Sequence, residues 1–285
     1  MFKNIRLFFV DSHPVTKLFL LLFGMLAIFF IVSFLGMVLA VPVFNISFSD
    51  LNALIINDLE NADNALIKYI QCVQSIGLFV IPGIVLYRLL YIPSNSSAGK
   101  SHTYQFYAGF LVFPTMIAMI PLVTALVIWN SNLHLPEGLS GIEDMIRRME
   151  NDAEVLTQKI LEGKSIGQYL INLFVIAVLP AIGEEFIFRG LIQRIFTEWI
   201  KNSFVAILIA GILFSAIHLQ FFGFVPRLFL GIYFGYLFHW SKNIWVAVWA
   251  HFLNNALAVS LHFFSLKNVS VFPTFFSETS ISTMN

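Results

Sequence analysis

The strongest constraint on this chain is its succession of long apolar stretches, separated for the most part by polar segments. A helix that crosses a bilayer needs about 20 apolar residues. About seven stretches qualify or nearly qualify, and they span residues 15–42, 66–92, 105–129, 166–187, 203–221, 222–240 and 243–265. The sequence therefore predicts an all-α fold, a polytopic transmembrane helical bundle of about seven or eight membrane helices.

The composition indicates lipid, and not water, as the solvent of this chain. Of the 285 residues, 58% are hydrophobic and 11% are charged, whereas soluble domains have about 25% charged residues. The formal net charge is zero, so we expect membrane lipids as partners and no nucleic acid. The single cysteine, Cys72, excludes an intramolecular disulfide and a cysteine-based zinc cluster.

Polar segments divide the chain into four predicted regions. Residues 1–130 form the N-terminal transmembrane helices, 131–165 an extramembrane loop, 166–266 a second transmembrane core and 267–285 a C-terminal tail. Apolar residues recur at helical spacing within 139–162, which predicts an amphipathic helix, either partly inserted or a solvated arm. Lysine and arginine in the short loops favour a cytoplasmic N-terminus.

The intramembrane polar residues concentrate in the second core, where each ionisable group is costly and marks a candidate functional site. Glu185 and Arg189 are four residues apart, so a helix makes them neighbours and predicts a charge-assisted pair. Glu184 lies about 100° away on the same helix without a local partner. We therefore expect Glu184 to act as a general base or acid and the pair to support it. An ordinary ion pair at a helix end would explain the pair but not Glu184.

Two later apolar stretches carry histidines. Phe214 and His218 are predicted to share one helix face, and His251 and Asn255 to project together from another helix. Singly, each is consistent with interhelical hydrogen bonding. Together, Glu184, His218 and His251 can bind one divalent metal such as zinc, with an open position for water. The same groups can instead activate water without a metal, with Asn255 holding the oxyanion. Both schemes predict hydrolysis.

Three motifs in order resemble one known family. Glu-Glu-x-x-Phe-Arg-Gly at 184–190, Phe-x-x-x-His at 214–218 and His-x-x-x-Asn at 251–255 resemble the CAAX-protease and bacteriocin-processing family (CPBP, also called Abi), which includes the type II CAAX prenyl endopeptidases. The resemblance covers about residues 165–265. It implies a helical membrane bundle with a polar intramembrane cavity and hydrolysis of peptide bonds, so that 166–266 would be the catalytic core.

The resemblance also implies roles for single residues. Glu184 would activate water, His218 and His251 would orient that water or bind a metal, and Asn255 would stabilise the oxyanion. The residues implied as structural support are Glu185, Arg189 and Phe214. We expect an intramembrane endopeptidase, of the metallo- or glutamate type, in the bacterial inner membrane. Its substrates would be membrane-associated or lipidated proteins or peptides that enter from the membrane.

Other classes fit the sequence less well. His-Glu-x-x-His, a Gly-x-Ser nucleophile paired with histidine, and a central intramembrane aspartate, which other intramembrane proteases need, are absent from the apolar stretches. A transporter would use the buried charges as an ion relay, but the paired halves with broken helices that are common in transporters are not evident. A catalytically silent scaffold or bacteriocin-immunity protein of the same family is the remaining alternative.

Overall fold

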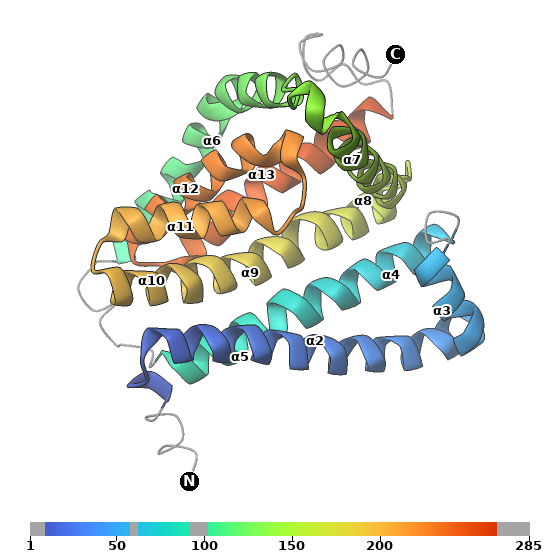
Figure 1. The fold of residues 1–285 in the computed structure, drawn as a ribbon, viewed down its shortest axis with the longest axis horizontal. Coiled ribbons are helices and arrows are strands. Elements are labelled where there is room, and N and C mark those ends of the chain that lie inside the picture. The colour runs from blue at the N-terminus through green and yellow to red at the C-terminus, as the bar shows by residue number, and fades with distance from the viewer. Residues whose placement is uncertain (1–8, 58–61, 92–101, 267–285) are drawn as a thin grey trace.

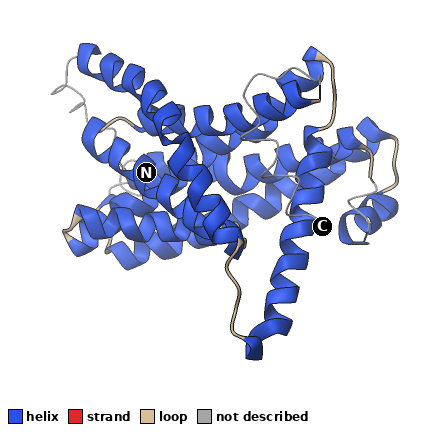
Figure 2. Ribbon diagram, turned by 90° about the horizontal axis from the view of Figure 1, so that it is seen from above, coloured by secondary structure: helices blue, strands red, loops and turns tan. Residues whose placement is uncertain are grey.

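The computed structural model describes residues 9–57, 62–91 and 102–266. These residues form helices and helical turns, with no strand among them (Figures 1 and 2). The all-α prediction is therefore confirmed. The tail predicted at 267–285 lies outside the described residues.

Six helices in the described part of the chain are long and apolar enough to cross a membrane, as an integral membrane protein requires. A further apolar helix, Ser203–Ala216, is shorter. The six long helices are Pro14–Phe44, Asn64–Leu90, Gly109–Ser131, Ile166–Ile200, Phe221–Ser241 and Ile244–Ser265.

Two predicted spans differ from the observed helices. The stretch predicted at 166–187 continues as one helical segment to Ile200. Glu185 and Arg189 are paired inside the protein and do not mark a membrane boundary. The helix predicted at 203–221 ends at Ala216. The expectation that His218 lies on a helix was therefore wrong, and this residue sits in the turn that follows.

The N-terminal helices form one layer of the molecule (Figure 1). Helix α2 packs against α4, α5 and the π-helical turn η2 that joins them. Many large apolar side chains of α2 are exposed, as a lipid-facing helix requires. The bounds are α2 (Pro14–Phe44), α3 (Phe48–Asn57), α4 (Asn64–Ser75), η2 (Ile76–Val80) and α5 (Ile81–Leu90).

The central element of the fold is the long segment Ile166–Ile200, in which α-helical and π-helical turns alternate. Such π-helical turns occur frequently at functional sites. In order, the parts are α8 (Ile166–Asn172), η5 (Leu173–Val178), α9 (Leu179–Glu185), η6 (Phe186–Ile192) and α10 (Gln193–Ile200).

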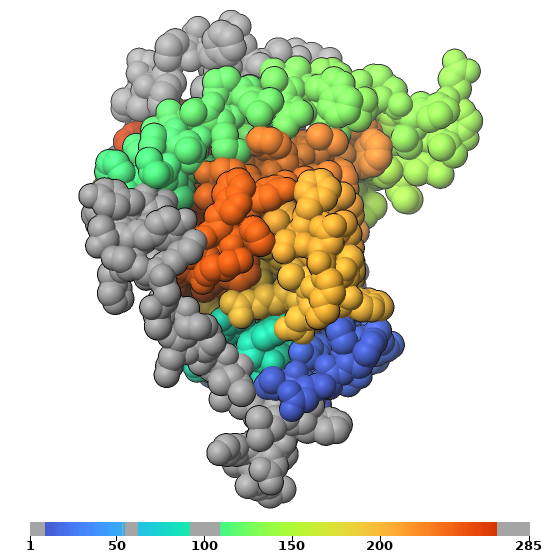
Figure 3. All heavy atoms as spheres, turned by 90° about the vertical axis from the view of Figure 1, so that its left-hand side faces the viewer, coloured from blue at the N-terminus to red at the C-terminus, as the bar shows by residue number. Residues whose placement is uncertain are grey.

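Helices α11 to α13 pack on this segment from the side opposite to α2, and α6 covers α12 and α13. Figure 3 shows the same order, with blue residues of α2 below, amber and orange residues from α10 onwards in the middle, and green residues of α6 above. The bounds are α6 (His102–Ser131), α11 (Ser203–Ala216), α12 (Phe224–Ser241) and α13 (Ile244–Ser265).

Helix α7 (Ser140–Leu161) points in a different direction from the membrane helices. It is seen nearly end-on in Figure 1, where α2 and α9 run across the picture. It occupies the segment 139–162 in which the sequence predicts an amphipathic helix. Ile142, Met145 and Met149 are exposed on it.

Glycines allow the helices around Glu184 to approach closely. A Cβ atom on Gly183 would lie 2.6 Å from Cβ of Phe79, so the turn η2 packs directly against α9 beside Glu184. A Cβ atom on Gly231 would lie 3.1 Å from Cα of Gly211, which brings α12 against α11. Small residues at such crossings are how membrane helices approach one another.

Candidate active site

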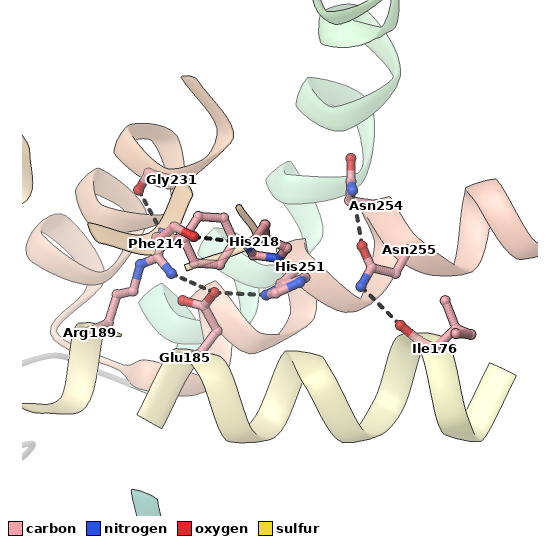
Figure 4. Close-up of polar contacts among 9 residues, drawn as sticks. All are labelled: Ile176, Glu185, Arg189, Phe214, His218, Gly231, His251, Asn254 and Asn255. Carbon is pink, nitrogen blue, oxygen red and sulfur yellow. Dashed lines mark hydrogen bonds and ion pairs between the residues drawn. The ribbon is translucent and has the colours of Figure 1, made fainter. Parts of the chain in front are cut away.

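A fully buried ion pair forms the base of the candidate site (Figure 4). Arg189 Nη1 donates to Glu185 Oε1 over 2.8 Å, and both side chains have no exposed surface. Arg189 Nη2 also donates to the carbonyl oxygen of Gly231 over 2.7 Å. The pair that helical spacing predicts is present, and it also ties the central segment to α12.

His251 joins this ion pair from α13. Its Nδ1 atom lies 2.9 Å from Glu185 Oε1. Its ring stacks on Phe234 at 5.3 Å and meets the edge of Phe214 at 5.7 Å between ring centroids. Because an ionised carboxylate only accepts hydrogen bonds, Nδ1 is the donor, and in the neutral ring Nε2 is then the acceptor. Glu185 therefore positions His251 as well as pairing with Arg189.

Glu184 is buried beside this network without belonging to it. Its side chain is 8% exposed, and among the described residues its Oε2 atom has no hydrogen-bond partner. It interacts electrostatically with His251, Glu185 and Arg189. A buried polar atom without a partner costs about 1–3 kcal/mol. Glu185 Oε2 also lacks a partner among the described residues, but Glu185 Oε1 is held by Arg189 and His251. Glu184 takes part in neither contact, so this carboxylate is the candidate for a chemical role.

His218 lies half-buried in the turn after α11. Its Nδ1 atom is 2.9 Å from the carbonyl oxygen of Phe214, and the two rings are 5.4 Å apart. Since a carbonyl accepts only, Nδ1 donates and Nε2 of the neutral ring is available as an acceptor. The next residue, Leu219, has a φ of 53°, which is strained for a bulky side chain and is typical of functional turns.

Asn255 is held away from this cluster, towards the turn η5 (Figure 4). Its Nδ2 atom donates to the carbonyl oxygen of Ile176 over 3.0 Å, and Asn254 donates to its Oδ1 over 3.1 Å. Pro180 has no N–H to offer to the Ile176 carbonyl four residues earlier, so Asn255 supplies a donor there. One amide N–H of Asn255 is thereby engaged in structure.

The comparison with protein families matches this region. Residues 166–257 match the family model for type II CAAX prenyl endopeptidases, described as Rce1-like. This segment is similar to that family. The similarity to type II CAAX prenyl endopeptidases that the three motifs predict is therefore confirmed over these residues. No curated protein and no solved structure matches the chain.

Glu184, His218 and His251, the residues expected to bind a metal, do not form a three-ligand site in this structure. In the described part of the chain, no three side chains of His, Cys, Asp or Glu lie where they could hold one metal ion. Nδ1 of His251 and Nδ1 of His218 both have protein partners. The observed arrangement does not fit a preformed three-ligand metal site, and a metal requirement stays a prediction from the sequence.

The turn that carries His218 is clamped by residues that sequence reasoning did not single out. Asn130, at the end of α6, donates to the carbonyl of Phe221 over 3.0 Å and accepts from the N–H of Val225 over 2.7 Å. Glu150 of α7 accepts from the N–H of Phe222 over 3.0 Å. Asn130 follows a predicted span and Glu150 lies in a charged helix, so neither carried a signal that separates it from an ordinary polar residue.

Proposed function

We propose that this protein is an intramembrane endopeptidase in which Glu184 activates the attacking water. One observation carries the proposal. The buried Glu184 carboxylate takes no part in the contacts that Oε1 of the neighbouring Glu185 makes with Arg189 and His251. Two adjacent carboxylates in such different environments are suited to different roles.

In the proposed reaction, Glu184 removes a proton from water while the water oxygen attacks the carbonyl carbon of the substrate. The carbonyl electron pair moves to oxygen and gives a tetrahedral oxyanion. Glu184 then returns the proton to the leaving nitrogen as the C–N bond breaks. His218 and His251 orient the water through Nε2, since Nδ1 of each is held by the protein. The free N–H of Asn255 is the oxyanion donor implied by the family resemblance.

We propose membrane-associated or lipidated proteins or peptides as substrates. The support is the position of the buried charges within the helix Ile166–Ile200, which is apolar enough to lie in the bilayer. A substrate that is already held in the membrane reaches such a site without crossing water. The bacterial inner membrane and a cytoplasmic N-terminus remain part of this proposal.

The test compares protein and peptide termini by mass spectrometry in membranes that contain equal amounts of wild type or Glu184→Gln. General acid–base catalysis contributes about 10²–10⁴-fold, so termini produced by this enzyme should disappear in the variant while its thermal unfolding stays near wild type. New termini only with the wild type would identify substrates directly. Identical termini, with a phenotype that survives Glu184→Gln, would instead support a silent scaffold or immunity protein.

A further inference from the structure

Arg227, in the first turn of α12, is a cation near the site that the mechanism above does not use. Its Nη2 atom donates to Oε1 of Gln220. Its Nη1 atom is closed off from solvent, and no residue in the described part of the chain accepts a hydrogen bond from it. A buried guanidinium N–H without an acceptor is costly, so a ligand or a reacting group that completes its hydrogen bonding is expected.

The position of this guanidinium depends on the backbone at Gly223. A Cβ atom at Gly223 would lie 2.6 Å from Arg227 Nη1 and 3.1 Å from Cζ, so the guanidinium occupies the space that a side chain would need. The same turn is clamped by Asn130 and Glu150. Arg227 is therefore held in the segment that directly follows His218, and it does not extend freely into solvent.

Arg227 is one of the charged groups around Glu184, together with His251 and Arg189. Glu185 and Arg189 neutralise each other in their own ion pair. Arg227 interacts electrostatically with Glu150, and also with Glu184 and His218. No hydrogen bond joins Glu184 to Arg227 in the described structure, because Glu184 Oε2 and Arg227 Nη1 both lack one. Each of these two atoms therefore has a hydrogen-bonding position that a bound substrate can fill.

We propose that Arg227 is a catalytic residue whose Nη1 N–H donates to the oxyanion of the tetrahedral intermediate. The inference rests on the proposed function. As Glu184 takes the proton of the attacking water, the carbonyl electron pair moves to oxygen, and that oxygen accepts the hydrogen bond from Nη1. When the C–N bond breaks, the electron pair returns and Glu184 protonates the leaving nitrogen. Asn255 already donates one N–H to Ile176, so Arg227 supplies the charged donor.

The experiment measures kcat and KM of the purified full-length protein in detergent. The substrate is a fluorogenic peptide built around one cleavage site found by the comparison of termini. Loss of one oxyanion donor costs about 10²–10³-fold in kcat, so Arg227→Gln should lose that much with KM little changed. Free guanidinium should restore part of the activity of Arg227→Ala but none of Glu184→Gln. The matched control is Arg148→Gln, since Arg148 is exposed on α7, and it should behave as wild type.

A second variant keeps the test decisive if Arg227→Gln does not fold. Gly223→Ala leaves the charge in place but displaces the guanidinium, which can swing away because it ends a flexible side chain. It should lower kcat, by less than Arg227→Gln, without a large change in thermal unfolding.

Two results would overturn the proposal. One is an unchanged kcat in Arg227→Gln and Gly223→Ala while Glu184→Gln is inactive. That result would contradict the role of Arg227 but not the proposed function. The other is a rise in KM alone, seen for a peptide with a free C-terminal carboxylate but not for its amidated counterpart, which would make Arg227 a binding residue for the substrate carboxylate. If Glu184→Gln itself remains active, the proposed function is contradicted, and the role proposed for Arg227 with it.

Discussion

Two membrane helices of similar length have very different surroundings in this protein. Pro14–Phe44 has 31 residues, and 6% of its most apolar 18 residues are buried. Ile166–Ile200 has 35 residues, and 50% of its most apolar 18 residues are buried. Most of the first helix is exposed on the surface of the protein, whereas other helices enclose the second. A helix can carry Glu184, Glu185 and Arg189 in a membrane only when protein, and not lipid, supplies their partners.

The largest effect is expected from removal of a metal ion, if the enclosed region requires one for catalysis. A metal-dependent mechanism predicts about one divalent ion per chain, lost in a variant with both His218→Ala and His251→Ala. Elemental analysis of purified protein measures this, and chelation should then abolish cleavage. Full activity in protein shown to be metal-free would establish the metal-free scheme.

Glu185→Gln should unfold the enclosed region more readily. It would leave Arg189 buried without its counter-charge, and breaking a buried pair in this way costs about 3–5 kcal/mol. Thermal unfolding in detergent measures the loss, and Glu184→Gln is the matched control because that carboxylate is adjacent but forms no such pair. An equal loss of stability in both variants would contradict the division of roles between the two glutamates.

A glycine at a close helix crossing and a glycine in an open position should respond differently to alanine. Gly231→Ala places a Cβ atom 3.1 Å from the Gly211 backbone, and overpacking of this kind costs about 1–3 kcal/mol. At Gly109 in α6, no described atom outside the helix's own neighbouring backbone lies within 4 Å of the added Cβ. Gly109→Ala should therefore leave thermal unfolding unchanged or raise it slightly, because alanine is the better helix former. A similar shift in both variants would show that helix propensity, and not close packing, matters at Gly231.

The smallest effect is expected at Glu143 on α7, a helix that is not among the six candidate membrane spans. The backbone N–H of Leu135, then Arg147 and His134, lower the pKa of Glu143 from 4.5 to about 2. Since the pKa is depressed in the folded protein, the stability that this carboxylate contributes is present above pH 4.5 and is lost as pH falls towards about 2. Hydrogen exchange at the Leu135 amide, corrected for intrinsic rates, should speed up in that window and lose the pH dependence in Glu143→Gln. An exchange rate that is already fast at pH 6 would contradict the prediction.

Parts of the site could be predicted from the sequence because they depend on local helix geometry. Glu185 and Arg189 are four residues apart, and any regular helix makes them neighbours. Where the backbone leaves the regular helix, the same reasoning failed. His218 was expected on a helix, but the chain turns after Ala216, and Leu219 takes a left-handed conformation that no residue type there indicates.

The class of fold could be predicted from the sequence alone, through apolar stretches that need lipid, and so could the similarity of residues 166–257 to type II CAAX prenyl endopeptidases, through three ordered motifs. Only the tertiary structure decided which distant groups meet. His251 reaches Glu185 across 66 residues, Arg189 reaches the Gly231 carbonyl across 42, and Asn255 reaches the Ile176 carbonyl across 79. The physical reason is that residue types do not indicate where backbone carbonyls lie or where helices cross. Their positions follow from how closely whole helices pack, and side chains such as Arg227 acquire their surroundings only then.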